Sequence, residues 1–421
     1  MSSDPARRRD EAYVWVWLPG ATKPVVAGRV QETGDLVNFN YGKSYLERDA
    51  AIPLYLPELP LRPGLIAPLG GLTLAGCIND AMPDAWGQRV VMNRLLGTGA
   101  DSADPALFGP LVYMLESSSD RIGAIDFQSS PDAHVAREDD DASLEELQEA
   151  ARLVDESKPL SAGLDRALLH GSSVGGARPK ALIADGERRL IAKFSSATDT
   201  YSVVKGEFAA MRLAARAGLD VAAVELTSAL GKDVLLVERF DRTNTPGGET
   251  RRAIVSALTM LELDEMAVRY ASYADLAQIV RERFSEPRAT LRELFGRIVF
   301  NILVGNTDDH ARNHAAFWDG EMLALTPAYD ICPQPRSGGV ASQGMMIAPN
   351  GFRLSQLSGC VGAASTYLLN EAEARQIIDR QIETIEAEWP EVCEQARLSE
   401  VERTYFWRRQ FLNAYALEGY R

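Results

Sequence analysis

Cysteine and histidine are scarce in this sequence, with four of each among 421 residues. The cysteines, Cys77, Cys332, Cys360 and Cys393, are far apart and show no paired spacing. This distribution argues against a disulfide framework and against a zinc site, and it is typical of a protein from a reducing cytosol. We therefore expect a cytoplasmic protein without a His- or Cys-based metal centre.

The sequence also lacks a signal peptide and a long apolar run, so we expect no membrane association. Its formal net charge of −15 argues against non-specific DNA binding by this chain alone. Contact with DNA is therefore expected only indirectly, through a partner. With 46% hydrophobic residues, the chain is long enough for two or three domains with sizeable cores.

What the sequence does contain is an acidic loop at residues 306–313, Asn-Thr-Asp-Asp-His-Ala-Arg-Asn. Asp308 and Asn313 are five positions apart. In kinase catalytic loops this spacing separates an Asp that accepts the substrate hydroxyl proton from an Asn that binds magnesium. Asp330 follows where a second metal-binding Asp is expected. Two ordinary polar loops would match equally well, because short motifs also occur by chance.

The segments around this loop indicate how it is held. Apolar residues recur at three- and four-residue intervals over 291–303, which predicts a helix buried on one side. Gly305 is expected to end that helix, so that the acidic loop begins at a rigid element. An Asp-Gly turn between the apolar runs 315–318 and 322–325 predicts a hairpin. The hairpin would return Asp330 towards the acidic loop.

A second region, residues 172–180, is a short Gly-rich loop with positive charge. Paired glycines let backbone N–H groups approach phosphate oxygens closely, although a plain tight turn has the same composition. A hairpin is predicted directly afterwards, from the apolar runs 181–184 and 190–194. Lys193 lies in its second strand, like the strand lysine that holds ATP phosphates in kinases.

A helix is predicted next, over residues 204–217, with Glu207 in its first turn. Glu207 would either pair with Lys193, as in kinases, or complement the helix dipole. The apolar run 234–240 then predicts a strand that corresponds to the kinase hinge, whose backbone binds adenine. The order of these elements along the chain is much more specific than any single motif.

Taken together, these motifs resemble the HipA-type serine/threonine kinase family, the toxin half of bacterial toxin–antitoxin pairs. The resemblance extends over most of the chain. The segments that carry it are 39–41, 53–57, 80–87, 120–124, 173–180, 237–242, 306–313 and 329–330.

The resemblance implies an enzyme that uses ATP and Mg²⁺. Asp308 would be the catalytic residue, Asn313 and Asp330 would hold the metal, and Ser173 would be autophosphorylated. The remaining residues expected to bind the nucleotide are Val174, Gly175, Gly176, Ala177, Arg178, Lys180, Lys193, Glu207, Val237, Glu238, Phe240 and His310.

The resemblance also implies a protein substrate that bears Ser or Thr, with an aminoacyl-tRNA synthetase as the family's suggestion. The implied partner is a small helix-turn-helix antitoxin. Two alternatives stay open. A small-molecule kinase of the aminoglycoside phosphotransferase type also uses the Asp-x-x-x-x-Asn loop, but it would not need the N-terminal 130 or so residues that resemble the toxin family. A non-catalytic corepressor subunit of a DNA-binding antitoxin would not need the set of Asp308, Asn313, Asp330 and Lys193.

The fold class expected from these patterns is α+β. We predict a bilobed, protein-kinase-like fold with a β-rich N-terminal lobe and a mostly helical C-terminal lobe. Residues 1–128 would form a β-rich HipA-like subdomain, 129–142 an acidic linker and 143–245 the nucleotide-binding part of the kinase core. Residues 246–421 would form the helical lobe with the catalytic and metal-binding loops. Ser143 and Glu146 match a capping box, which predicts that a helix begins there.

Overall fold

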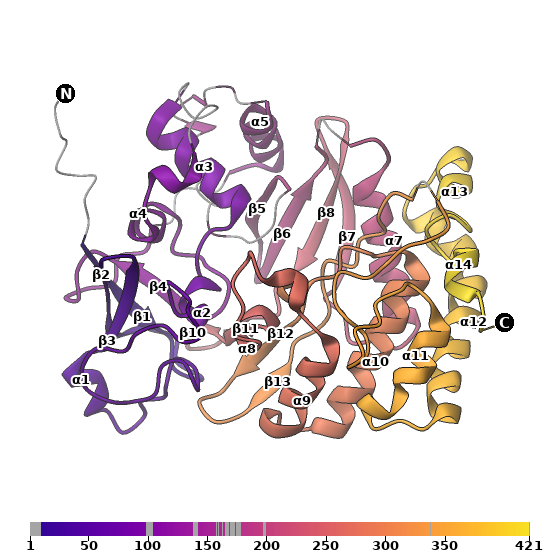
Figure 1. Ribbon diagram of the computed structural model, residues 1–421. Coiled ribbons are helices and arrows are strands. Elements are labelled where there is room, and N and C mark those ends of the chain that lie inside the picture. The colour runs from indigo at the N-terminus through magenta and orange to yellow at the C-terminus, as the bar shows by residue number, and fades with distance from the viewer. Residues whose placement is uncertain are drawn as a thin grey trace. The chain divides into compact units, whose positions relative to one another are not determined.

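The structure of the chain is a computed structural model (Figure 1). It describes residues 10–97, 104–137, 142–156, 158, 160–161, 163–164, 168, 173, 178–196, 199–336 and 338–420.

The chain divides into two compact units, and each is described by itself. Unit 1 consists of Met1–Thr198, Ser228–Val255 and Trp318–Glu321. Unit 2 consists of Asp199–Thr227, Ser256–Phe317 and Met322–Arg421. The four-part division expected from the sequence stays a prediction.

Unit 1 contains most of the strands. One antiparallel sheet has the order β3-β2-β1-β4, and β5, β6 and β8 pair antiparallel in another. The strands within unit 1 are β1 Glu11–Val16, β2 Val25–Thr33, β3 Leu36–Tyr41, β4 Ile125–Gln128, β5 Lys180–Asp185, β6 Arg188–Phe194, β8 Lys232–Glu238, β9 Arg242–Thr245 and β10 Gly248–Arg251. Its helices are α1 Lys43–Leu46, α2 Gly76–Asn79, α3 Ala85–Leu96, η3 Pro105–Leu107, α4 Pro110–Glu116 and α5 Leu144–Asp155.

The hairpin predicted after the Gly-rich loop is present as β5 and β6. Gly186 in its turn has a φ of 59°, a left-handed conformation that glycine adopts without steric cost. The apolar faces of this sheet and of α3 and α5 share one buried core, and the Trp86 indole donates to the Lys180 carbonyl oxygen at 2.9 Å. Helix α5 begins with the predicted capping box of Ser143 and Glu146. These contacts hold the start of β5 on the N-terminal part of the chain.

A second stabilising feature of unit 1 is the buried carboxylate of Asp126 on β4. The Arg121 Nε donates to it at 3.0 Å, and the Arg137 Nη2 donates at 3.1 Å. The His134 Nε2 lies 2.8 Å from the second carboxylate oxygen. His134 and Arg137 both come from the range predicted as a linker, so this part of it packs onto β4. Burial alone would raise the pKa of Asp126, but these partners hold it below its ordinary value.

This pKa shift predicts that unit 1 loses stability in acid. Because the folded-state pKa of Asp126 is below the unfolded value, its stabilisation is complete above about pH 4 and is lost as the pH falls towards the folded-state pKa. The free energy of unfolding, measured by denaturant titration at several pH values, should fall below about pH 4. An Asp126→Asn variant should show a shallower acid dependence, and an unchanged slope in that variant would contradict the assignment.

Unit 2 contains most of the longer helices, which Figure 1 shows in orange and yellow together with α7. Its elements are α7 Val203–Arg216, α8 Ala257–Met260, η4 Val268–Tyr270, α9 Tyr273–Arg283, α10 Pro287–Val304, η5 Ala311–Asn313, β13 Leu323–Leu325, α11 Leu357–Ala363, η6 Ala364–Tyr367, α12 Glu371–Gln395, α13 Glu400–Phe406 and α14 Ala414–Leu417. Three strands span the boundary between the units: β7 Val224–Ala229, β11 Ala253–Ser256 and β12 Ala315–Trp318.

Helix α10 is the central helix of unit 2, and it matches the helix predicted over 291–303. Its apolar stripe is fully buried, as expected from the periodicity: Leu291, Leu294, Phe295, Ile298, Val299, Ile302 and Leu303 are each at most 1% exposed. Removing this much apolar surface from water is the main favourable contribution to the stability of such a core. The helix therefore provides a rigid support for the loop that follows it.

Two structural observations concern the cysteines and the long apolar runs considered in the sequence analysis. All four cysteines are free and buried. Among the residues that the structure describes, no helix combines the length and the apolar character needed to cross a bilayer.

Candidate active site

The acidic loop begins where α10 ends. Gly305 terminates the helix in the left-handed conformation, with a φ of 70°. A Cβ atom at this position would lie 2.9 Å from the Gln410 carbonyl oxygen, so both the backbone angle and the space favour glycine. The Asn306 N–H donates to the Asn301 carbonyl oxygen at 2.8 Å, which turns the chain out of the helix. The helix end predicted from the sequence is confirmed.

Asp309 anchors this loop in the core of unit 2. Its carboxylate is 2% exposed and accepts hydrogen bonds from the Tyr273 hydroxyl and from the Asn301 amide, the latter at 2.7 Å. The His314 Nε2 lies 3.0 Å from the same oxygen. Burial would raise the pKa of Asp309, but the charge and hydrogen bonds of His314, with the Tyr273 hydroxyl, hold it below its ordinary value. These contacts fix the backbone on both sides of Asp308.

A close backbone contact supports the loop from a different segment. A Cβ atom on Gly344 would lie 2.6 Å from the Asp309 carbonyl oxygen, closer than side chains approach backbone atoms in proteins. Only glycine therefore allows the segment around Gly344 to pack against Asp309.

Asp308, in contrast to its neighbour, is exposed to solvent. The protein atoms around it nevertheless raise the pKa of its carboxyl, and the charges of Asp330 and Asp309 raise it further, whereas His310 opposes them. Asp330 has a φ of 59°, an uncommon left-handed conformation for a residue with a side chain. Strain of this kind is often found where a side chain must have a defined direction.

Asn313 completes the group of oxygen-bearing side chains. It is the last residue of η5, it is 8% exposed, and its amide nitrogen lies 3.5 Å from the Asp308 carbonyl oxygen. The Tyr329 hydroxyl donates to the Arg312 carbonyl oxygen at 2.7 Å, so the chain after the hairpin returns to the acidic loop, as predicted. The Nδ1 atom of the nearby His310 is buried and has no hydrogen-bond partner among the described residues.

This donor set fits a hard divalent cation. Carboxylate and amide oxygens are the ligands that Mg²⁺ takes in phosphoryl-transfer sites, where one or two protein carboxylates bind it together with substrate phosphates. The charge of Asp330 raises the pKa of Asp308, and a bound cation would offset repulsion of this kind. In the described ranges, no group of three or more His, Cys, Asp or Glu side chains is arranged to hold a metal.

The residues predicted to bind nucleotide phosphates lie in unit 1. Lys180 and Lys193 are directly opposite each other on the β5–β6 ladder, and Lys180 is 5% exposed. Val237 and Glu238 lie at the end of the neighbouring strand β8, which ends before Phe240 rather than at Phe240 as predicted.

Glu207 differs from its predicted position. It is the fifth residue of α7, beyond the first turn, and its side chain is 3% exposed. The helix-dipole role considered from the sequence is therefore disfavoured, because that effect is confined to the first turn. Since Glu207 belongs to unit 2 and Lys193 to unit 1, their pairing stays a prediction.

A charged cluster that sequence reasoning missed lies directly after β8. The Arg239 guanidinium donates to the Asp120 carboxylate at 2.8 Å and to the Asp241 carboxylate at 2.8 and 2.9 Å. Arg242 donates to the same two carboxylates, at 2.9 Å and 2.8 Å. The side chains of Arg239 and Arg242 are 1% and 2% exposed, so the cluster is buried. It joins two segments quoted above only for their resemblance, 120–124 and 237–242.

Ser173 contacts this cluster. It is 1% exposed, and its hydroxyl donates to the Asp120 carbonyl oxygen at 2.7 Å. Arg178 is half-buried. The other predicted residues of the Gly-rich loop, Val174, Gly175, Gly176 and Ala177, lie outside the described residues.

The Asp309 anchor was also missed. Asp309 and His314 are five positions apart, like the predicted catalytic pair Asp308 and Asn313, but one residue later.

Comparison with known proteins gives a consistent result. The HipA-like C-terminal domain family matches residues 172–389, more than half of the chain. A protein of Sinorhizobium fredii with the name “Putative kinase Y4mE” is 28% identical over 343 residues, which cover 75% of this chain and 76% of that protein.

Two further comparisons involve Shewanella oneidensis. Its serine/threonine-protein kinase toxin HipA is 31% identical over 148 residues, covering 31% of this chain and 34% of the toxin. A solved complex of HipA, HipB and operator DNA from that organism contains a chain with a TM-score of 0.68 and 21% identity, covering 94% of this chain and 95% of that one. At this identity the match establishes the fold, and it confirms the α+β, kinase-like class expected from the sequence.

Proposed function

Because this chain belongs to the HipA-like C-terminal domain family, we propose that it is an ATP-dependent serine/threonine protein kinase and the toxin of a bacterial toxin–antitoxin pair. The contrast between Asp308 and Asp309 carries the proposal. One carboxylate is exposed with a raised pKa, and the next is buried and saturated with hydrogen bonds. A rigid anchor beside a free base is the arrangement that general-base catalysis needs.

In the proposed reaction, the substrate hydroxyl oxygen attacks the γ-phosphorus of ATP. The new O–P bond forms while the bond from that phosphorus to the β–γ bridging oxygen breaks, and ADP leaves. Asp308 accepts the proton of the hydroxyl group. Asn313 and Asp330 would hold Mg²⁺, which neutralises phosphate charge when it is bound. Positioning and charge neutralisation supply most of the rate enhancement in such reactions.

The residues proposed to hold the nucleotide phosphates and adenine all belong to unit 1. Lys180 and Lys193 would contact phosphate oxygens, and the Gly-rich loop would cover them. The backbone from Val237 to Phe240 would lie near adenine.

The proposed partners are inferred from the solved complex that contains the similar Shewanella chain. The Shewanella structure contains HipB and operator DNA together with HipA. We infer for this chain a small helix-turn-helix antitoxin, with DNA reached only through it, because a net charge of −15 opposes direct binding to DNA. A cytoplasmic location belongs to the same proposal.

A label-transfer assay tests the function. The full chain is incubated with γ-labelled ATP and Mg²⁺, alone and with bacterial cell extract. Label on protein supports the proposal. Label only on small molecules would indicate a small-molecule kinase, and absence of transfer would indicate a non-catalytic corepressor.

Nucleotide binding should also stabilise the fold. A ligand that binds only the folded state at a hundredfold excess over its dissociation constant stabilises that state by about 2.7 kcal/mol. ATP with Mg²⁺ should therefore raise the thermal midpoint, and Lys193→Ala should reduce this shift because a phosphate contact is lost. Differential scanning fluorimetry with millimolar nucleotide measures both. No change of midpoint in the unmodified protein would count against every kinase interpretation.

Ser173 is the proposed site of self-phosphorylation. Because it is buried, it must become accessible before it can react. The hydroxyl that donates to the Asp120 carbonyl oxygen must leave this contact before it can accept phosphate. A phosphate would add nearly two negative charges close to where ATP phosphates bind. Mass spectrometry after incubation with ATP and Mg²⁺ should find phosphate on Ser173, and Ser173→Asp should lose ATP affinity. Normal ATP binding by Ser173→Asp would contradict the proposal that phosphorylation of Ser173 prevents ATP binding.

A further inference from the structure

Four large apolar side chains of unit 2 are exposed on two segments that adjoin the acidic loop. Met266 is 82% exposed, Tyr270 59%, Val340 76% and Leu354 36%. We call these four residues the apolar patch. Isolated exposed apolar residues are common on protein surfaces, but a contiguous group indicates an interaction site.

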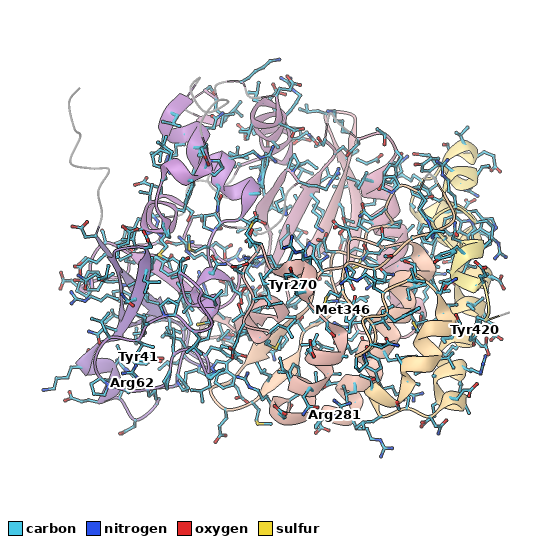
Figure 2. The ribbon with its side chains drawn as sticks, viewed as in Figure 1. Tyr41, Arg62, Tyr270, Arg281, Met346 and Tyr420 are labelled. Atoms are coloured by element: carbon cyan, nitrogen blue, oxygen red, sulfur yellow. The ribbon has the colours of Figure 1, made fainter. Side chains whose placement is uncertain are left out.

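Hydrogen bonds join the two segments into one surface. The Tyr273 N–H donates to the Met346 carbonyl oxygen at 2.8 Å, and the Met346 N–H donates to the Ala271 carbonyl oxygen at 3.1 Å. Figure 2 labels Tyr270 and Met346, which lie close together in that view. The Arg353 guanidinium donates to the Arg269 carbonyl oxygen at 3.1 Å, next to Tyr270 and Leu354.

The second segment is itself a folded loop. The Gln343 N–H donates to the Arg353 carbonyl oxygen at 2.7 Å, and the Ser355 N–H donates to the Ala341 carbonyl oxygen at 2.9 Å. These bonds bring the neighbourhoods of Val340 and Leu354 together.

The same surface is attached to the acidic loop at three points. The Arg312 guanidinium forms an ion pair with Glu265 at 2.6 Å, beside Met266. The Tyr273 hydroxyl donates to the Asp309 carboxylate. Gly344 packs against the Asp309 carbonyl oxygen. The patch therefore has a defined position relative to Asp308.

The charges around the patch indicate the chemistry of its occupant. Glu265 is in an ion pair with Arg312, whereas Asp264 accepts only the neutral Ala267 N–H, at 2.7 Å, and keeps its charge. Arg269 is exposed and lies over the Tyr270 ring, 4.9 Å from its centroid. Within the part of the chain that the structure describes, neither Arg269 nor Arg353 forms an ion pair with a carboxylate. Two arginines beside apolar side chains complement a segment with acidic and apolar residues.

We propose that the apolar patch binds the acceptor protein beside the Ser or Thr that receives the phosphoryl group. The patch selects a segment with a large apolar side chain and an acidic residue. This inference rests on the proposed kinase function. The patch would raise the local concentration of the acceptor hydroxyl at Asp308 without taking part in the chemical step. The substrate class is therefore an acidic, apolar segment of a protein rather than a small molecule.

The experiment measures transfer from γ-labelled ATP to dephosphorylated casein, an acidic and flexible acceptor, and ATP hydrolysis without acceptor. The variants are Met266→Ser/Tyr270→Ser and Arg269→Gln/Arg353→Gln, and Val401→Ser on α13 is the matched control, since Val401 is 80% exposed. Both patch variants should raise the KM for casein about tenfold with little change in kcat, because two interface side chains are lost. ATP hydrolysis should be unchanged, and Val401→Ser should behave as the unmodified protein.

The arginine variant adds a test of charge. It should lose less activity towards myelin basic protein, a basic acceptor, than towards casein. Equal KM values for casein in the unmodified protein and the Met266→Ser/Tyr270→Ser variant would overturn the proposal, as would a parallel loss of ATP hydrolysis. An unmodified protein that hydrolyses ATP but does not label casein would overturn the proposed selectivity. An unmodified protein that neither hydrolyses ATP nor labels any acceptor would instead refute the kinase function.

Discussion

Replacing Asp308 by Asn should slow phosphoryl transfer by about 10²- to 10⁴-fold, the usual contribution of a general base. The amide cannot accept the hydroxyl proton, although it is almost the same size as the carboxylate. Because Asp308 is exposed, the substitution should leave folding intact, and the loss should appear in kcat. Rates with saturating ATP and protein acceptor, measured beside the thermal midpoint, give the result.

Asp309→Asn is the matched control, because it makes the same chemical change one residue later. Here the carboxylate is buried and accepts hydrogen bonds from Tyr273, Asn301 and His314. An amide would leave at least one of these donors without an acceptor, so the thermal midpoint should fall. If Asp309→Asn is inactive with a normal midpoint while Asp308→Asn is active, the roles assigned to the two residues are reversed.

Replacing Arg239 by Met should lower the free energy of unfolding by about 3–5 kcal/mol, because removing one partner from a buried ion pair leaves uncompensated charge. Asp120 and Asp241 would both lose a donor in a region with little access to water. Chemical denaturation at neutral pH measures the loss. The expected effect is a large fraction of the stability of an ordinary domain.

Arg29→Met, also in unit 1, is the control for this effect. Its guanidinium pairs with Glu11 at 2.8 Å, as short as the contacts of Arg239, but the two side chains are 42% and 37% exposed. Exposed pairs contribute only about 0–1 kcal/mol, so this variant should be nearly as stable as the unmodified protein. Similar losses in both variants would show that burial of the Arg239 cluster does not set its contribution.

The parts of the fold that sequence predicted correctly depend on local patterns. The stripe of α10 and its end at Gly305, the β5–β6 hairpin with Gly186, and the capping box at Ser143 are each encoded within a few residues. Local backbone preference and hydrophobic periodicity act over that range.

The parts that were missed depend on contacts between distant residues. Arg239 and Asp120 are 119 positions apart, and Tyr273 and Asp309 are 36 apart. Each is an ordinary charged or polar residue until folding buries it, so local pattern carries no sign of the pairing. Glu207 was predicted in the first turn of a helix beginning at residue 204, but α7 begins one residue earlier, at Val203, without a side-chain cap that the sequence would have revealed.

Asp120 connects Ser173 with the arginine cluster through two different groups. Its carbonyl oxygen accepts a hydrogen bond from Ser173, and its carboxylate accepts hydrogen bonds from Arg239 and Arg242, which follow β8. Any coupling between these two contacts is reciprocal, so that what favours the seated position of Ser173 favours the arginine contacts to the same extent.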